Sequence, residues 1–156
     1  MKLARRAGVL AHPTSLPGPG GLGDLGPATE EFLDWCSEAD LGLWQLLPVG
    51  PTDEELSPYA SPSSFAGNPR LISARALADR GWLDEADVDR QGRGILEASW
   101  AWFRQRGSAA ARSALAEFLA APAQAAWLED WVLYAALKRR FEGRGWTGWP
   151  AALRAR

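Results

Sequence analysis

Two short apolar runs with an amphipathic segment between them constrain the fold of this chain more than any other feature. The first run is residues 8–11 (GVLA), which is typical of a buried parallel strand, and the second is residues 43–49 (LWQLLPV). Between them, residues 27–39 repeat apolar side chains at the i, i+3, i+4, i+7 spacing of one helix face: Phe32, Trp35, Cys36 and Ala39. A strand, a helix and a strand in this order form a βαβ unit with a parallel pair. The sequence therefore predicts an α/β fold.

A loop rich in proline and glycine follows each predicted strand. Residues 12–26 (HPTSLPGPGGLGDLG) follow the first strand, and residues 57–69 (SPYASPSSFAGNP) come after the second. Ligands of α/β folds gather at the carboxyl ends of the strands, where such loops emerge. The prolines of 57–69 stiffen that loop around Tyr59 and several hydroxyls, which suits a polyhydroxylated ligand such as a sugar. The alternative is an ordinary connector with a packed aromatic residue.

The rest of the chain is predicted to be helical. The expected helices cover residues 71–80, 94–105, 108–121 and 124–141, and a short turn capped by Asp84 carries Leu83 as a hydrophobic staple. Leu115, Phe118 and Leu119 are expected to face inward, and the last helix is expected to be buried on more than one side. Five tryptophans fall in this half: Trp100, Trp102, Trp127, Trp131 and Trp146. They indicate a helical core, with an aromatic sugar-binding face as the alternative.

Composition excludes several classes of function. The net charge of −2 argues against a nucleic-acid partner, and no run of about 20 apolar residues predicts a membrane span. A single cysteine, Cys36, forms no internal disulfide, which fits a cytoplasmic protein with an inert, buried thiol. One histidine and one cysteine cannot assemble a His/Cys metal site. Ser15 near His12 makes only a weak dyad, because no acid orients the histidine.

Four motifs together resemble the N-terminal part of the amylomaltases, the bacterial 4-α-glucanotransferases or disproportionating enzymes. They are HPTSLPGPGGLGDLG at 12–26, WQLLPVGPT at 44–52, SPYASPSSFAGNPRLI at 57–72 and the WxxWP pattern at 146–150. The resemblance runs from about Arg6 to about Leu153. It implies the first βαβ part of a (β/α)8 TIM barrel plus an α-helical subdomain, with the barrel incomplete. The expected division is a barrel segment at 1–74 and a helical insertion at 75–156.

The resemblance also implies an enzyme activity. Amylomaltases transfer α-1,4-glucan segments between maltodextrins by a retaining double displacement, without a metal or an organic cofactor. An aspartate is the nucleophile, a glutamate is the acid/base, and a second aspartate stabilises the transition state. No residue of this chain matches these carboxylates, which the family carries on later strands. We therefore expect a chain that lacks the C-terminal barrel sequence and is inactive alone, or alternatively a non-catalytic glucan-binding or structural remnant.

The expected partner is an α-1,4-glucan or maltooligosaccharide, and four residues match family positions around it. Tyr59 matches a tyrosine that lines the glucan site, and Ser57 matches a sugar-contacting hydroxyl. His12 and Gln45 match recurring residues at strand ends, with a near-site or architectural role. At Glu54 some relatives carry an aromatic residue that contacts glucan outside the active cleft, so the resemblance does not carry an auxiliary glucan-binding spot over to this chain.

Overall fold

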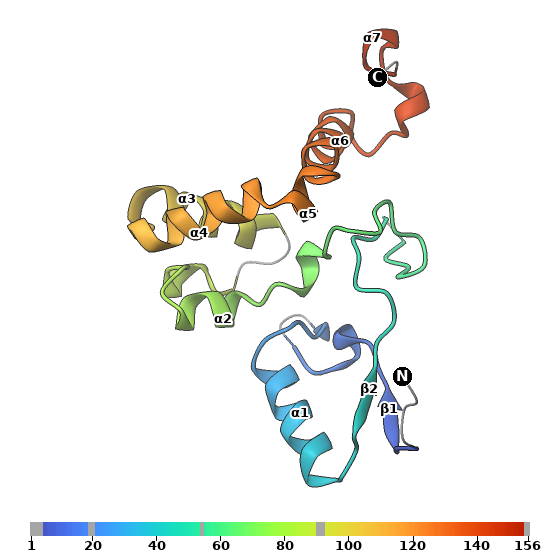
Figure 1. Ribbon diagram of the computed structural model, residues 1–156, viewed down its shortest axis with the longest axis vertical. Coiled ribbons are helices and arrows are strands. Elements are labelled where there is room, and N and C mark those ends of the chain that lie inside the picture. Colours follow the sequence, from blue (N-terminus) through green and yellow to red (C-terminus); the bar gives the residue numbers. More distant parts are fainter. Residues whose placement is uncertain (1–4, 19–20, 54, 90–92, 155–156) are drawn as a thin grey trace. The chain divides into compact units, whose positions relative to one another are not determined.

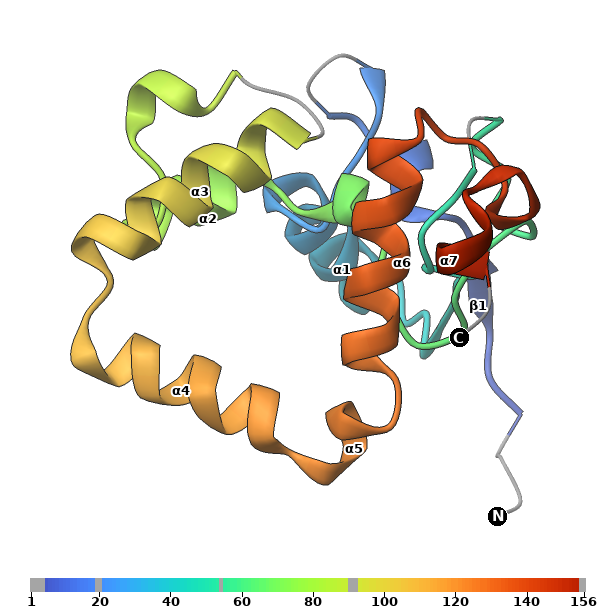
Figure 2. The ribbon, with the colours of Figure 1, turned by 90° about the horizontal axis from the view of Figure 1, so that it is seen from above.

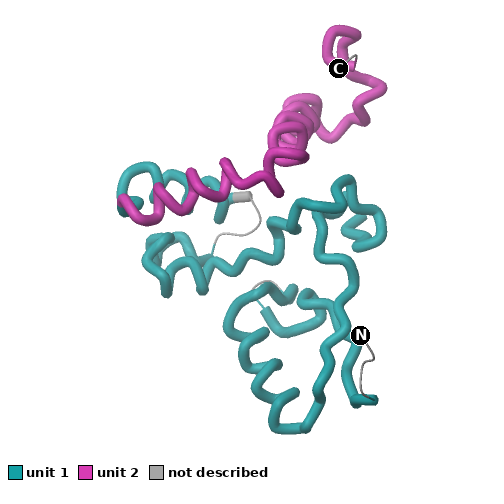
Figure 3. The backbone as a smooth tube through the Cα atoms, viewed as in Figure 1, with its two compact units in different colours: residues 1–108 teal, residues 109–156 magenta. Residues whose placement is uncertain are grey.

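The computed structural model (Figure 1) describes residues 5–18, 21–53, 55–89 and 93–154. Its contacts divide the chain into two compact units, residues 1–108 and residues 109–156 (Figure 3). The first unit mixes strands and helices, and the described part of the second is helical. The division predicted at residue 74 falls inside the first unit and stays a prediction. Within the described residues, no helix has both the length and the apolar character needed to cross a bilayer.

The predicted βαβ unit is confirmed. Strand β1 (Gly8–Leu10) pairs in parallel with β2 (Leu43–Gln45), with Val9 opposite Trp44, and helix α1 (Pro27–Glu38) connects them (Figure 1). Pro27 begins α1, where its missing N–H costs no hydrogen bond. The strands approach so closely that a Cβ on Gly8 would lie 2.5 Å from the carbonyl oxygen of Leu43. A glycine is therefore required at this position of the pair.

The expectation that these elements are buried is wrong for most of their apolar side chains. Leu10 is 57% exposed, Leu43 is 54% exposed, and Trp35 on α1 is 52% exposed. Cys36 is buried as predicted. The reason is that an apolar run favours a strand, but burial also requires an element packed on each face, and the described sheet has two strands.

Two aromatic residues hold α1 against the strand pair. The rings of Phe32 and Trp44 meet edge to face with their centroids 5.0 Å apart. The indole Nε1–H of Trp44 also donates a 2.9 Å hydrogen bond to the carbonyl oxygen of Ala11. The aromatic contact and the hydrogen bond therefore fix the start of the first loop relative to β2.

The loop 12–26 is anchored at both of its ends. It begins with the short 3-10 helix η1 (Pro13–Ser15), whose Pro13 is fully buried. Near its end, the N–H of Leu25 donates to the carbonyl oxygen of Leu71 at 2.9 Å, and Thr29 Oγ1 donates to that of Asp24 at 2.7 Å. Leu71 closes a second 3-10 helix, η3 (Pro69–Leu71). The loops that follow the two strands are therefore joined to each other.

Helices α2 (Ala74–Asp79) and α3 (Arg93–Arg106) are neighbours, with α3 above α2 in Figure 1 and overlapping it in Figure 2, and η4 (Glu85–Asp87) lies between them in sequence. Their small core consists of Ala74, Leu83 and Ile95, with Leu77, Ala78, Val88 and Ala98 packed against it. Leu83, which the sequence places for a hydrophobic staple before η4, is buried in this core, and Val88 after η4 packs against the core. Helix α2 begins three residues later than predicted, because residues 69–71 form η3.

Ion pairs connect these elements on the exposed side. Asp84 does not cap η4 through its side chain as predicted, and its Oδ1 instead accepts a 2.7 Å hydrogen bond from Arg106. The guanidinium of Arg75 on α2 donates to both carboxylate oxygens of Glu85, at 2.5 and 2.9 Å, and also pairs with Asp79. Arg75 therefore ties α2 to η4 across ten residues of sequence.

The second unit contains α4 (Ala109–Ala120), α5 (Pro122–Ala125), α6 (Leu128–Arg140), η5 (Trp146–Gly148) and α7 (Ala151–Arg154). The helix predicted over 124–141 is interrupted at Trp127, whose φ of −145° is not helical. The predicted inward positions of Phe118 and Leu119 are wrong, because these side chains are 47% and 53% exposed. Helix α6 has no fully buried residue, and Val132 is 57% exposed. An apolar helix face is buried only where another element packs against it, and apolar composition alone does not provide that element.

Candidate functional site

A pocket of about 320 Å³ lies between the two loops that follow β1 and β2. Because the strands are parallel, both loops leave the sheet at its carboxyl edge, where α/β proteins bind ligands. The first loop lines it with His12, Thr14, Ser15, Leu22 and Gly23, and the second with Leu47, Thr52, Leu56, Pro58, Asn68 and Arg70. Side chains separated by more than fifty positions in the sequence therefore share one cavity.

His12 joins the sheet to this pocket. Its ring Nδ1 lies 2.8 Å from Thr14 Oγ1 and accepts a 3.4 Å hydrogen bond from the backbone N–H of Thr14. A neutral imidazole that accepts at Nδ1 carries its proton on Nε2. The Nε2 atom is buried and has no hydrogen-bond partner among the described residues. Among the described residues, the recorded side-chain contacts of His12 are with Thr14 and not with Ser15. His12 lines the pocket, and its near-site or architectural role stays a prediction.

The second loop is held by its own hydrogen bonds. Asn68 is 9% exposed, its Oδ1 accepts from the N–H of Arg70 at 3.0 Å, and its N–H donates to the carbonyl oxygen of Val49 at 2.9 Å. Ser63 Oγ accepts from the N–H groups of Phe65 and Ala66 at 3.2 and 3.0 Å. The loop therefore has a defined shape without regular secondary structure.

The other predicted site residues lie outside the pocket lining. Tyr59 is 75% exposed, and Ser57 is half-buried. These two residues flank Pro58, which does line the pocket. Gln45 is exposed, and its carbonyl oxygen accepts a 3.2 Å hydrogen bond from the N–H of Ala11. Glu54 lies outside the described residues.

Sequence reasoning missed most of the pocket wall, including Thr52, Asn68 and Arg70. All three lie inside the quoted motifs, but the motifs give them no role, because only the meeting of the two loops brings them close to Thr14 and Ser15. Asn68 alone carried a local signal, since an asparagine directly before Pro69 is typical of the N-cap of a helix.

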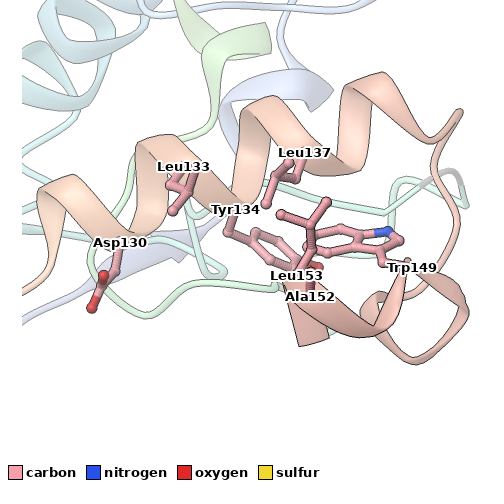
Figure 4. Close-up of a pocket in the computed structure, with 7 residues that line it drawn as sticks. All are labelled: Asp130, Leu133, Tyr134, Leu137, Trp149, Ala152 and Leu153. Carbon is pink, nitrogen blue, oxygen red and sulfur yellow. The ribbon is translucent and has the colours of Figure 1, made fainter. Parts of the chain in front are cut away.

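The second unit holds a separate pocket of about 620 Å³ between α6, η5 and α7 (Figure 4). Its lining residues are Asp130, Leu133, Tyr134, Leu137, Trp149, Ala152 and Leu153. The ring of Trp149 lies 5.8 Å from that of Tyr134 and 5.7 Å from that of Phe141, measured between centroids. Trp149 is 5% exposed, and its Nε1–H donates to the carbonyl oxygen of Arg144 at 3.1 Å. Trp149 is therefore packed as a core residue, and its ring face is not open to a sugar.

The parallel pair, its crossover helix and the loop-built pocket define an α/β protein with a pocket at the carboxyl edge of its strands, where such folds bind ligands. A family model described as 4-alpha-glucanotransferase matches residues 11–156. The chain therefore belongs to the 4-alpha-glucanotransferase family, as its motifs predicted.

Individual relatives agree with this assignment. The 4-alpha-glucanotransferase of Thermus thermophilus is 45% identical over 169 residues, which cover 100% of this chain and 33% of that protein. The 4-alpha-glucanotransferase of Synechocystis sp. is 37% identical over 161 residues, covering 93% and 32%. The structure of "Amylomaltase from Streptococcus agalactiae in complex with acarbose" matches with a TM-score of 0.82 and 30% identity, over 94% of this chain and 32% of that one. This match confirms the predicted fold class, the first βαβ part of a (β/α)8 barrel with an α-helical subdomain. The chain spans about a third of the length of the relatives it matches.

Proposed function

We propose that this chain forms the N-terminal part of a 4-α-glucanotransferase, which transfers α-1,4-glucan segments between maltodextrins with retention of configuration. The observation that carries the proposal is the family match over residues 11–156, a range that includes both loops of the site. The alternative, a non-catalytic remnant, has no observation of its own in its favour.

In this proposal, the chain binds glucan but does not cleave it. The family carries its nucleophile, acid/base and stabilising carboxylates on later strands, and no residue of this chain matches them. Tyr59 and Ser57 contact the glucan, while His12 and Gln45 support the site. The relative from Streptococcus agalactiae is named in complex with acarbose, which supports a carbohydrate ligand for this chain as well.

A chimera tests the proposed activity. This chain replaces the matching third of the Thermus thermophilus enzyme, and transfer is measured as glucose released from maltotriose. We expect an active chimera, whereas the 156-residue chain alone releases no glucose. An inactive but folded chimera, or glucose release by the chain alone, would contradict the proposal.

The role of Tyr59 is tested by binding. We expect Tyr59→Ala to weaken maltoheptaose binding by about tenfold in titration calorimetry, because loss of an aromatic stacking contact costs about 1 kcal/mol or more. Phe65→Ala is the matched control, since Phe65 is an equally exposed aromatic residue of the same loop, at 71%. Equal losses in both variants would show that the loop, not Tyr59, is responsible.

A further inference from the structure

We propose that helix α6 is a dimer interface, on which a second copy of this chain packs its own α6 in the antiparallel direction. The proposal concerns the second unit and does not depend on the proposed function. It is carried by one exposed face of the helix, which we call the outer stripe and which consists of Glu129, Val132, Leu133, Ala136 and Arg140. Apolar side chains form the middle of this stripe, and opposite charges form its two ends.

The outer stripe lies beside the side of α6 that faces η5 and α7. On that side, α6 lines the pocket with Asp130, Leu133, Tyr134 and Leu137 (Figure 4). The residues of the outer stripe follow the i, i+3, i+4, i+7, i+11 spacing of a neighbouring helix face, and Leu133 belongs to both faces. Val132 is 57% exposed and Leu133 is 42% exposed. The helix therefore has an apolar face that is open to a partner.

The charges at the ends of the outer stripe give the direction of packing. Glu129 lies in the first turn of α6 and Arg140 in its last turn, and both side chains are exposed. Neither forms an ion pair with another described residue. An antiparallel copy brings the partner's Arg140 opposite Glu129, whereas a parallel copy sets like charges opposite each other. The outer stripe is thus complementary to a second copy of itself, as a two-fold interface requires.

The register of this packing agrees with the apolar residues. Glu129 and Arg140 are equally far in sequence from the midpoint between residues 134 and 135, and Leu133 and Ala136 are equally far from the same midpoint. A two-fold axis through this midpoint therefore places Leu133 against the partner's Ala136 while it also pairs the charges. Large side chains interdigitate well with small ones across such a contact. One axis satisfies both the charged ends and the apolar middle.

The size of α6 sets the strength of the dimer. Its 13 residues span about 20 Å, so one pair of helices buries less than the roughly 1,200 Å² of a stable interface. We therefore expect a weak dimer, with a dissociation constant on the order of 100 µM. The two-fold packing closes at two copies, whereas the unpaired edges of the strand pair allow further copies to add.

Sedimentation velocity of two charge-reversed variants tests the interface. Both carry Leu10→Lys, which reduces association through the strand edges, and the chain with Leu10→Lys alone is the reference. Glu129→Arg and Arg140→Glu each set like charges opposite each other at both ends of the packing. We expect each variant alone to dimerise about tenfold more weakly than the reference, or worse. In an equimolar mixture the ends are complementary again, and we expect a heterodimer of about the reference affinity.

Matched variants separate the interface from net charge and from helix stability. Glu31→Arg and Arg80→Glu reverse the same charges at exposed positions of α1 and at the end of α2, and we expect both to dimerise like the reference. Far-UV circular dichroism compares helix content, because each reversal in α6 also opposes the helix dipole. Val132→Ala leaves the charge unchanged, and we expect a dimer about three- to tenfold weaker. Leu119→Ala, at an exposed position of α4, is expected to have no effect.

Three results would overturn the dimer interface. They are a reference chain that stays monomeric up to about 1 mM, single variants that dimerise as well as the reference, and a mixture that stays monomeric although both variants keep the circular dichroism of the reference. If a charge-reversed variant loses helix, Val132→Ala decides the question, and an unchanged dissociation constant in that variant would also overturn the interface.

Discussion

Gly23 lies where the first loop closes against η1, and its surroundings leave no room for a side chain. A Cβ at this position would press against the carbonyl oxygen of Pro13 and lie 2.6 Å from that of Leu16. Both are backbone atoms, so neither can rotate away. We expect Gly23→Ala to lower the free energy of unfolding by about 1–3 kcal/mol, measured by urea denaturation.

Gly67 provides the control, because a Cβ built there meets nothing within 4 Å. We expect Gly67→Ala to change the free energy of unfolding by no more than about 0.5 kcal/mol, or to raise it slightly. Unfolding curves that coincide for Gly23→Ala and the parent chain would contradict the close approach in the loop.

Residue by residue, the sequence predicted the part of the site that carries a local signal. His12 directly follows a strand run, and the structure places it in the lining of the pocket at that edge. Arg70 follows Pro69 in what reads as the start of a helix, and nothing near it in sequence indicates a pocket. Its proximity to Thr14 depends on the hydrogen bond from Leu25 to Leu71, which a pattern within one segment cannot express.

At the scale of elements, the bond from Arg75 to Glu85 makes the contact of α2 with η4 dependent on pH. Hydrogen bonds from Arg75 hold the pKa of Glu85 below its ordinary value of 4.5, and the same bonds raise the pKa of Arg75. A lowered carboxyl pKa stabilises the fold above the ordinary pKa, and this contribution is lost as the pH falls through the folded-state value. The pair is exposed, so its effect is small and screened by salt.

The matching experiment compares melting temperatures of Glu85→Gln and the parent chain. We expect the variant to melt lower at neutral pH, and we expect this difference to shrink as the pH falls through the lowered folded-state pKa of Glu85. Asp34→Asn, an exposed carboxylate on α1, controls for the change in net charge. A difference that persists undiminished in acid would show that the glutamine disturbs packing and that the ion pair is not responsible.

Elements were predictable where periodicity is long, and burial was not. For α1 and α3, the ends predicted from the apolar spacing lie within one or two residues of the observed ends. The same spacing gave Phe118 and Leu119 an inward face that they do not have. A helical pattern reports which side of a helix is apolar, whereas burial depends on whether another element covers that side. The break at Trp127 was also invisible, because the apolar pattern continues through it.

For the whole molecule, the described sheet is the part that we expect to drive self-association. Each of its two strands leaves one edge unpaired, and Leu10 and Leu43 expose more than half of their surface. We expect the sedimentation coefficient of the chain to rise with protein concentration, and Leu10→Lys to reduce this rise. Leu119→Lys is the control, since Leu119 is comparably exposed on α4. A monomer at every concentration would contradict the prediction, as would an equal effect of both lysines.

The place of this strand pair in the chain also matters while the protein is being made. Both strands lie within the first 45 residues, so the ribosome releases them before any helix of the second unit. At about 5–20 residues per second, roughly 3–13 s pass between the synthesis of β2 and that of Ser108. Leu10 and Leu43 stay more than half exposed in the folded chain as well, so we expect chaperones to bind the strand pair from its synthesis onward.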